Sequence, residues 1–230
     1  MTKNELQSES INEAFSKELI NTSLDLTIDY SEVALDSVLS DNITSEIPIV
    51  KSIVSLGRLG ISIKQLHFTK KVLCFLREFH SRNLTSNFSE FKQKLITDHK
   101  FKYKVTEQII LIIDRLRTEQ RSVLLAKLFL GHIQEKYDWE TFCYFSECLD
   151  SMQPVDIDIL GYLSTKESDE IENIAIHSFD RYMLLGSIER LKSYGFVGMK
   201  GLTWISTADD FKKEAFISSL GVIIYNAIIS

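Results

Sequence analysis

Apolar residues at helical spacing recur in segment after segment of this 230-residue chain, and they constrain its fold more than any other feature. Within such segments the apolar side chains stand three and four positions apart, which places them on one face of an α-helix. Only two prolines interrupt the pattern. Because amphipathic helices bury their apolar faces against one another, the sequence predicts a mainly α protein built as a multi-helix bundle.

The limits of the helices follow from the apolar spacing and from the polar residues that break it. The predicted helices cover residues 10–20, 29–40, 49–61 continuing to 80, 86–96, 102–116, 121–134, 138–150, 155–163 and 177–195, with a last helix from about 207. Acidic Asp138 stands where it can cap the helix that follows it. Thr207 with Asp210 resembles a capping box for the last helix.

The segment 198–207 differs from the helical remainder. Two glycines flank Lys200, and an aromatic, β-branched run follows them, which is typical of a small hairpin. Helices followed by a hairpin are the order of a winged helix. The predicted fold is therefore a multi-helix bundle followed by a small winged-helix-like α+β module. The predicted domains are an acidic N-terminal helical arm at 1–45, a bundle with basic central helices at 46–152, and the winged-helix-like module at 153–230.

Charge is distributed unevenly along the chain, whose net charge is −6. Residues 1–50 carry two basic and ten acidic side chains, whereas residues 51–104 carry twelve basic and three acidic ones. The basic block suits an anionic partner such as a phospholipid surface or nucleic acid, because clustered positive charge concentrates anions. In the alternative interpretation, the acidic arm lies over the basic block and neutralises it. The sequence leaves both open.

The run IPIVKSIVSLGRLGISI at 47–63 is apolar apart from Lys51 and Arg58, which stand seven positions apart and share one helical face. The face predicted to enter a core or a membrane comprises Ile49, Val50, Ile53, Val54, Gly57, Gly60 and Ile61. A central bundle helix explains this pattern, with glycines that permit close neighbours. A segment at an anionic membrane explains it as well, and a partner helix is a third interpretation. The predicted anion contacts are Lys51, Arg58, Lys64, Lys70 and Lys71.

The helix before the hairpin raises a nucleic-acid hypothesis, since winged helices insert that helix into the major groove. The candidate contacts are Arg181, Arg190, Lys192 and Lys200. Asp180 and Glu189 oppose them on the same element, and the remaining surplus of positive charge is small for phosphate binding. The alternatives are that the module packs on the helical body or recognises protein.

No motif in the sequence indicates catalysis, a cofactor or a metal. The three cysteines and five histidines lack zinc-ligand spacing. The acidic residues that could suggest a cation site are interpreted as solvated side chains: Asp156, Asp158, Glu167, Asp169, Glu170 and Glu172. We expect no catalytic, cofactor-binding or metal-binding residue, no small-molecule substrate, and a protein that is not an enzyme. An enzyme with a site assembled from distant residues remains the competing class.

Compartment is inferred from the cysteines and the first residues. An odd number of cysteines and a start, MTKNELQSES, without a signal-peptide pattern predict the reducing cytoplasm. The longest uncharged window, at 215–230, has 16 residues and is shorter than a bilayer span. We expect a cytoplasmic protein, placed peripherally at the inner membrane if the membrane interpretation holds.

Three segments, 46–64, 121–142 and 185–207, together resemble the Abi-alpha domain family of bacteria, whose name links it to abortive infection. The resemblance implies antiviral phage defence and carries no residue-level site. Lys51 is a departure, because the family has a small residue after the IPIV run, and this counts against a membrane-inserting hairpin. The expected function is a non-enzymatic bacterial defence protein that acts through a protein partner, a homo-oligomer or a membrane surface. The alternative is a winged-helix DNA-binding regulator.

Overall fold

The computed structural model of the protein describes residues 3–20, 48–55, 62–81, 86–174, 180–200 and 213–229. These residues are mainly α-helical, with a small three-stranded antiparallel sheet near the C-terminal end. The predicted fold class, a helical bundle followed by a small α+β module, is confirmed. The chain divides into two compact units, Met1–Phe142 and Cys143–Ser230. The predicted domain limits after residues 45 and 152 stay predictions.

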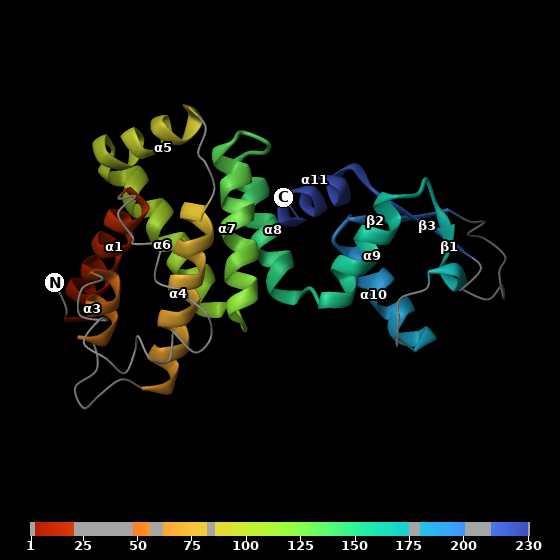
Figure 1. Cartoon of the computed structure of the whole chain (residues 1–230), viewed down its shortest axis with the longest axis horizontal. Helices are drawn as coiled ribbons and strands as arrows, with labels where there is room; N and C mark the ends of the chain where they lie inside the picture. Colours follow the sequence, from red (N-terminus) through yellow and green to blue (C-terminus); the bar gives the residue numbers. More distant parts are fainter. Residues whose placement is uncertain are drawn as a thin grey trace. The chain divides into compact units, whose positions relative to one another are not determined.

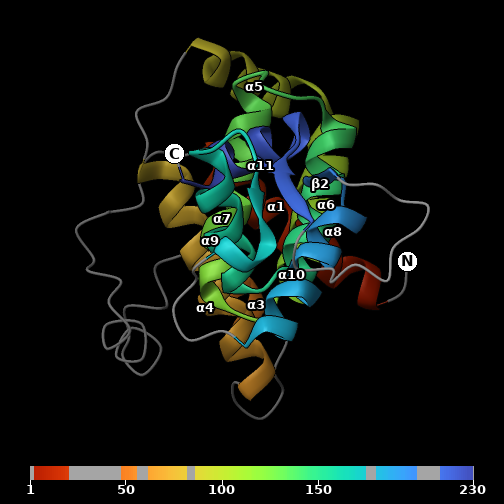
Figure 2. The ribbon, with the colours of Figure 1, turned by 90° about the vertical axis from the view of Figure 1, so that its right-hand side faces the viewer.

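The N-terminal unit is a bundle of helices. Its elements are α1 (Lys3–Ile20), α3 (Pro48–Val54), α4 (Ile63–Ser81), α5 (Ser86–Thr97), α6 (His99–Arg115), α7 (Glu119–Ile133) and the first residues of α8 (Trp139–Ser151). Helix α4 lies alongside α7 (Figures 1 and 2), and α1 packs against α3, α5 and α6. The phenylalanines of the core have ring centroids 5.4 to 6.2 Å apart: Phe15, Phe75, Phe79, Phe129 and Phe142. Aromatic pairs of this kind each contribute about 1 kcal/mol beyond the area that they bury.

Helix starts in this unit are fixed by side-chain caps. The Asp98 carboxylate accepts hydrogen bonds from the backbone N–H groups of Lys100 and Phe101, each at 3.0 Å. This cap starts α6 three residues earlier than the periodicity predicted, since periodicity does not register capping. Asp138 accepts from the backbone N–H of Thr141 at 2.8 Å, which confirms the predicted acidic cap of α8.

A buried polar contact joins α1 to α4. The ring of His80 binds the backbone carbonyl of Glu18 through Nε2 at 2.8 Å. Because a carbonyl only accepts, Nε2 carries the proton, and the buried Nδ1 has no hydrogen-bond partner among the described residues. Burial lowers the pKa of His80. Burial also raises the pKa of the Glu18 carboxyl, against a hydrogen bond from the backbone of Ile49.

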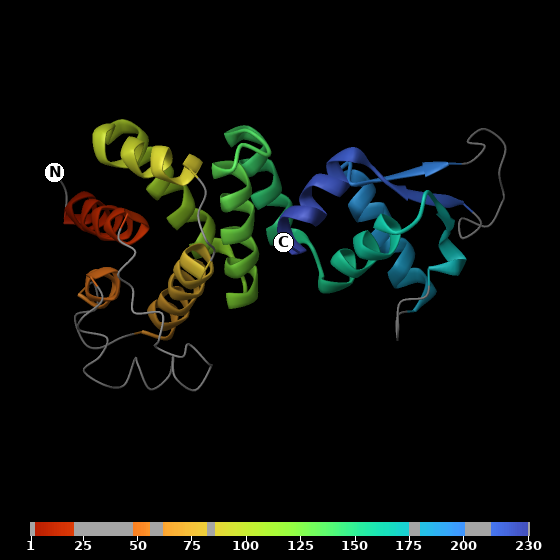
Figure 3. The same cartoon turned by 45° about the horizontal axis from the view of Figure 1, so that its top comes forward.

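The C-terminal unit combines three helices with the sheet. Beyond the end of α8 its elements are α9 (Pro154–Ser164), β1 (Asp169–Glu170), the 3-10 helix η2 (Ile171–Asn173), α10 (Arg181–Ser193), β2 (Val197–Lys200), β3 (Glu214–Ile217) and α11 (Ser219–Ile229). Strand β3 is antiparallel to both neighbours in the order β1-β3-β2. Figure 3 shows β2 and β3 running side by side. Phe145 of α8 packs against Phe196 with ring centroids 5.9 Å apart.

The end of the chain differs from the prediction. The sequence placed both hairpin strands within 198–207 and started the last helix near 207, but the partner strand is β3 at Glu214–Ile217 and α11 starts at Ser219. Pairing on both edges buries Ala215 and outweighs the local helical pattern. The predicted helix at 29–40 and the proposed Thr207 cap lie outside the described residues.

The acidic stretch after α9 is also more ordered than predicted. Residues 169–173 form β1 and η2, whereas the side chains of Glu167 and Glu172 are exposed, as predicted. Asp169 accepts hydrogen bonds from Lys166, from Tyr162 at 2.7 Å and from Asn173 at 3.2 Å. These bonds, with the one from Lys166 the strongest, hold the pKa of Asp169 well below its ordinary value. The carboxylate therefore stabilises the turn between α9 and the sheet.

Close backbone approach shapes the start of α11. A Cβ atom at Gly221 would stand 2.1 Å from the carbonyl oxygen of Phe196. That carbonyl also accepts the backbone N–H of Ser218 at 2.9 Å. Only glycine permits this helix to lie so near the turn that leads into β2.

Candidate functional site

Of the apolar run that the sequence singled out, the residues in α3 are part of the core of the N-terminal unit, whereas Ile63 is 76% exposed. In α3, Ile49, Val50 and Ile53 are fully buried, and the helix packs against α1 and α4. Lys51 is exposed, and Val54 is the last residue of the helix. The remaining residues of the predicted apolar face, Gly57, Gly60 and Ile61, and the predicted anion contact Arg58 lie outside the described residues. Among the described residues, no helix combines the length and apolarity that crossing a bilayer requires.

The three lysines of α4 that were predicted to contact anions differ in their exposure to solvent. Lys64 is exposed and Lys70 is half-buried. Lys71 is only 7% exposed, and its Nζ donates to the backbone carbonyls of Asp114 at 2.7 Å and Leu116 at 2.8 Å. The prediction that Lys71 faces an anionic partner is wrong. Its ammonium instead satisfies carbonyl groups at the C-terminal end of α6, where the helix dipole favours a cation.

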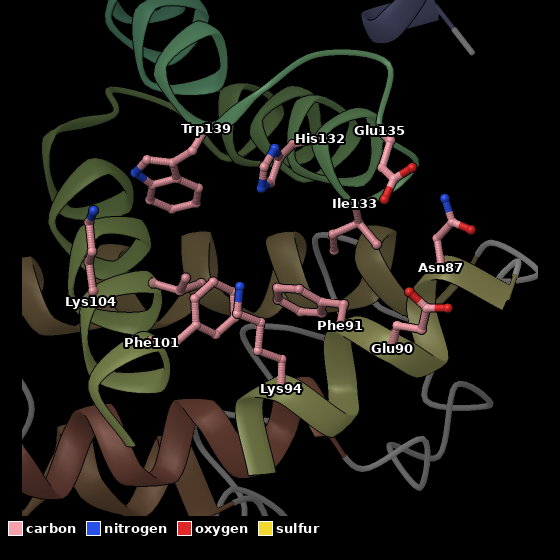
Figure 4. Close-up of a pocket in the computed structure, with 11 residues that line it drawn as sticks. Asn87, Glu90, Phe91, Lys94, Phe101, Lys104, His132, Ile133, Glu135 and Trp139 are labelled. Carbon is pink, nitrogen blue, oxygen red and sulfur yellow. The ribbon is translucent and has the colours of Figure 1, made fainter. Parts of the chain in front are cut away.

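A cavity of about 440 Å³ opens in the N-terminal unit between α5, α6, α7 and the start of α8. Its lining residues are Asn87, Glu90, Phe91, Lys94, Phe101, Lys104, Val105, His132, Ile133, Glu135 and Trp139. Figure 4 shows the rings of Trp139 and His132 along one side and those of Phe91 and Phe101 along the other. The cavity is thus a slot with aromatic walls.

The aromatic walls are anchored in the core. Phe91 packs on Phe129 with ring centroids 5.4 Å apart, and Trp139 packs on Phe142 at 5.1 Å. His132 is fixed by a contact of 3.1 Å between Nδ1 and the backbone carbonyl of Tyr137. Since Nδ1 must donate to that carbonyl, the neutral ring has an unprotonated Nε2 that accepts hydrogen bonds. These contacts place the wall residues before any ligand enters.

Charged groups at the rim are separated by sign. Figure 4 shows Lys104 near Trp139 and Lys94 beside Phe101, whereas Glu90, Glu135 and Asn87 gather toward the other end. The Lys94 ammonium stands 4.3 Å from the centroid of the Phe101 ring. The slot therefore has a basic end and an acidic end.

Glu135 occupies a backbone position that favours glycine. Helix α7 ends with hydrogen bonds from Lys136 N–H to the Gly131 carbonyl and from Glu135 N–H to the His132 carbonyl, the pattern of a Schellman motif, and Glu135 has φ of 58°. Helix α10 ends with the same motif, in which Gly195 takes the equivalent position with φ of 70°. A side chain in this conformation costs about 1 kcal/mol. At the end of α7, the residue that has this unfavourable backbone conformation also places its carboxylate at the rim of the cavity.

A second hollow, of about 510 Å³, lies in the C-terminal unit between the start of α9 and α10. It is lined by Gln153, Pro154, Val155, Asp158, Met183, Gly186, Ser187 and Arg190. Beneath it, the fully buried Asp156 carboxylate accepts two hydrogen bonds from the Arg190 guanidinium, at 2.9 and 2.7 Å, and one from the backbone N–H of Gln153 at 2.7 Å. Asp156 raises the pKa of Arg190. The interpretation of Asp156 as a solvated side chain is wrong, because its charge is paired inside the unit.

The predicted nucleic-acid contacts mostly have partners within the unit. Arg190 binds Asp156, and Lys192 forms an ion pair with Glu189 at 3.1 Å. Lys200 contacts the Ser168 hydroxyl at 3.3 Å. Arg181 is exposed in the first turn of α10.

The exposed start of α10 carries two large apolar side chains beside Arg181. Tyr182 is 74% exposed and Met183 is 58% exposed. One turn later, Gly186 stands inside the helix, and a Cβ placed there would have no heavy atom within 4 Å. Glycine inside a helix costs about 1 kcal/mol relative to alanine. Among the described residues of the unit, no packing contact accounts for this glycine, and its lack of a side chain keeps the hollow open.

Neither cavity was predicted from the sequence, because each joins residues from several helices. In the sequence, nothing around Gly186 or Asp156 indicated the open space above the glycine or the ion pair of the carboxylate. Comparisons with protein-family models, with curated proteins and with solved structures find no match to this chain. Among the described residues, no group of three or more His, Cys, Asp or Glu side chains could hold a metal ion.

Proposed function

We propose that this chain is a non-enzymatic bacterial interaction protein of the phage-defence kind, and that its C-terminal unit binds a protein partner through α9 and α10. The observation that carries the proposal is Gly186. A helix glycine with open space above it, beside exposed Tyr182 and Met183, is what a surface needs when another protein must approach the backbone closely. The assignment to phage defence rests on the resemblance of the sequence to the Abi-alpha family.

The chemistry of the surface favours protein over nucleic acid or lipid. Aromatic residues and methionine are enriched in the centres of protein interfaces, where a few anchors carry most of the binding energy. Phosphate binding needs cations, but Arg190 and Lys192 already pair with carboxylates. The apolar residues of α3 are buried in the N-terminal unit, which counts against a membrane surface as the target.

The hollow beside Gly186 gives the partner a place to insert a side chain. Its rim combines apolar Pro154, Val155 and Met183 with the carboxylate of Asp158. An apolar anchor with a basic neighbour would complement this lining, since rim charges select the partner more than they add affinity. A second copy of this chain is one partner of that class, and a different protein is another.

The test fills the hollow without disturbing the fold. Gly186→Leu adds a side chain whose Cβ has no heavy atom within 4 Å and which replaces a helix glycine, so the C-terminal unit should keep its melting temperature or gain a few degrees. We expect this variant, and the double variant Tyr182→Ala with Met183→Ala, to lose protection against phage in a plaque assay at equal expression. The matched control is Val222→Ala with Ile223→Ala, exposed apolar residues of α11 in the same unit.

The outcomes separate the partners. Loss of protection together with a change from dimer to monomer in light scattering identifies a second copy as the partner, and loss without such a change identifies a different protein. Full protection by both surface variants would refute the proposal.

One observation favours a second candidate function, DNA binding by a winged helix. Helix α10 directly precedes β2 and β3, and the sheet order β1-β3-β2 is the order expected when a helix precedes a wing. This candidate predicts binding to duplex DNA that weakens steeply with salt, and Lys192→Gln should reduce the salt dependence. Fluorescence anisotropy with a labelled duplex at two salt concentrations measures both. Absence of binding at low salt would exclude it.

A further inference from the structure

We propose that the cavity of the N-terminal unit binds a small planar heteroaromatic ligand with an anionic group, the chemistry of a mononucleotide. The proposal concerns a different unit from the proposed protein-binding surface and does not depend on it. It goes beyond the sequence, which predicted no small-molecule site. The volume of about 440 Å³ lies within the range of small-molecule pockets.

The ring of the ligand is recognised by the aromatic walls. Trp139 and His132 face Phe91 and Phe101 across the slot (Figure 4). Within each wall the two rings are nearly perpendicular, at 75° for Phe91 and Phe101 and at 68° for His132 and Trp139, so a flat ring stacks on one of them and meets the edge of the other. Stacking of this type tolerates any base. Because Phe91 and Trp139 are packed on the phenylalanine core, they hold the slot open without a loss of side-chain entropy on binding.

The anionic group is recognised at the basic end. Lys104 and Lys94 both line the cavity and are exposed, so their ammonium groups reach a phosphate at the mouth without burial of the charge. The Lys94 ammonium covers a face of the Phe101 ring at 4.3 Å, which places its charge at the wall of the slot. Ring and anion are therefore bound by adjacent groups.

Hydrogen-bond donors of the ring are recognised at the acidic end. The carboxylates of Glu90 and Glu135 accept hydrogen bonds, as an exocyclic amino group requires, and Nε2 of His132 offers another acceptor. An anionic ligand placed the other way round would meet these carboxylates and be repelled. The separation of charge thus fixes the orientation of the ligand.

The backbone of Glu135 is an independent sign that this end is used. The equivalent position in α10 is glycine, and glycine at 135 would relieve the conformation with φ of 58°. The carboxylate at the rim is the group that such a replacement would remove. Glu135→Gly is therefore expected to raise the melting temperature of the unit and to weaken ligand binding, a combination that a purely structural role does not produce.

The experiment uses Trp139 as the reporter. The full chain has two tryptophans, so Trp204→Phe leaves Trp139 as the single one. Titration with AMP should quench its fluorescence to saturation, because the base stacks on the indole. Adenosine, which lacks the anion, and ribose 5-phosphate, which lacks the ring, should each bind at least about tenfold more weakly than AMP.

Variants in the same background test each end. Lys104→Gln should raise the Kd for AMP about fivefold and leave the Kd for adenosine unchanged. Glu135→Gly should raise the Kd for AMP about fivefold and also raise the melting temperature. Lys136→Gln, at an exposed lysine that does not line the cavity, is the control and should bind as the parent does. No saturable quenching by AMP up to millimolar concentration would overturn the proposal, and so would equal affinities for AMP and adenosine.

Discussion

Replacement of Lys71 by methionine tests the interior lysine of α4. Methionine keeps an unbranched stem of similar length and removes the ammonium that donates to the carbonyls of Asp114 and Leu116. Those carbonyls lie at the end of α6, where the helix supplies no donor of its own. We therefore expect the N-terminal unit, and not the C-terminal unit, to lose stability.

The magnitude follows from the two contacts. Hydrogen bonds to a charged group contribute about 1.5 to 3 kcal/mol each. The charge near the helix terminus adds up to about 2 kcal/mol. Relief from burying an ammonium that is 7% exposed offsets part of this sum, so we expect a net loss of about 3 kcal/mol. For a unit of this size, that loss lowers the melting temperature by about 10 °C.

Urea unfolding and calorimetry at pH 7 measure the loss. Lys64→Met is the matched control, because Lys64 is exposed on the same helix, and it should change stability by less than about 0.5 kcal/mol. Lys71→Gln keeps two hydrogen-bond donors without the charge, and its stability should lie between that of Lys71→Met and that of Lys64→Met. If Lys71→Met were as stable as Lys64→Met, the ammonium would not support the end of α6, and the reasoning would be refuted.

Three further predictions concern other buried groups. Because burial lowers the pKa of His80 below its ordinary value of 6.5, the unfolded chain takes up this proton first. The N-terminal unit should therefore lose stability as the pH falls below 6.5, and His80→Gln should reduce that slope in urea unfolding. Burial raises the pKa of Cys148 to about 11, so iodoacetamide at pH 8 should label it far more slowly in the native protein than in urea, by mass spectrometry. Gly221→Ala should destabilise the C-terminal unit by about 2 kcal/mol through its clash with Phe196, whereas Gly186→Ala should not; equal melting temperatures would contradict this.

The helices could be predicted because their apolar spacing is a local property. The predicted helix at 121–134 corresponds to α7 at Glu119–Ile133, and the one at 155–163 to α9 at Pro154–Ser164. The spacing does not predict which other elements a helix packs against. Lys71 stands on the basic side of α4 by sequence, and only the distant end of α6 makes its burial favourable. The position of strand β3 was predicted wrongly for the same reason. Its pairing with β1 and β2 depends on residues that are distant in the sequence, so the local pattern does not indicate it.

The candidate sites were less predictable than the fold. The cavity of the N-terminal unit joins residues from 87 to 139, and no short motif connects its aromatic walls with its lysines. Two signals were present in the sequence and were informative only after the helices were placed. A glycine in the middle of an amphipathic helix, Gly186, and a glutamate one residue past the C-cap of a helix, Glu135, both depart from the locally favoured residue.

The strand order of the sheet has a consequence for synthesis on the ribosome. Strand β3 lies between β1 and β2 but follows both along the chain. Translation therefore delivers the whole N-terminal unit first, and then two strands whose hydrogen-bonding edges have no partner until residues 214–217 emerge. A pause in translation before that point leaves a nascent C-terminal unit in which β1 and β2 both lack the strand that pairs with them.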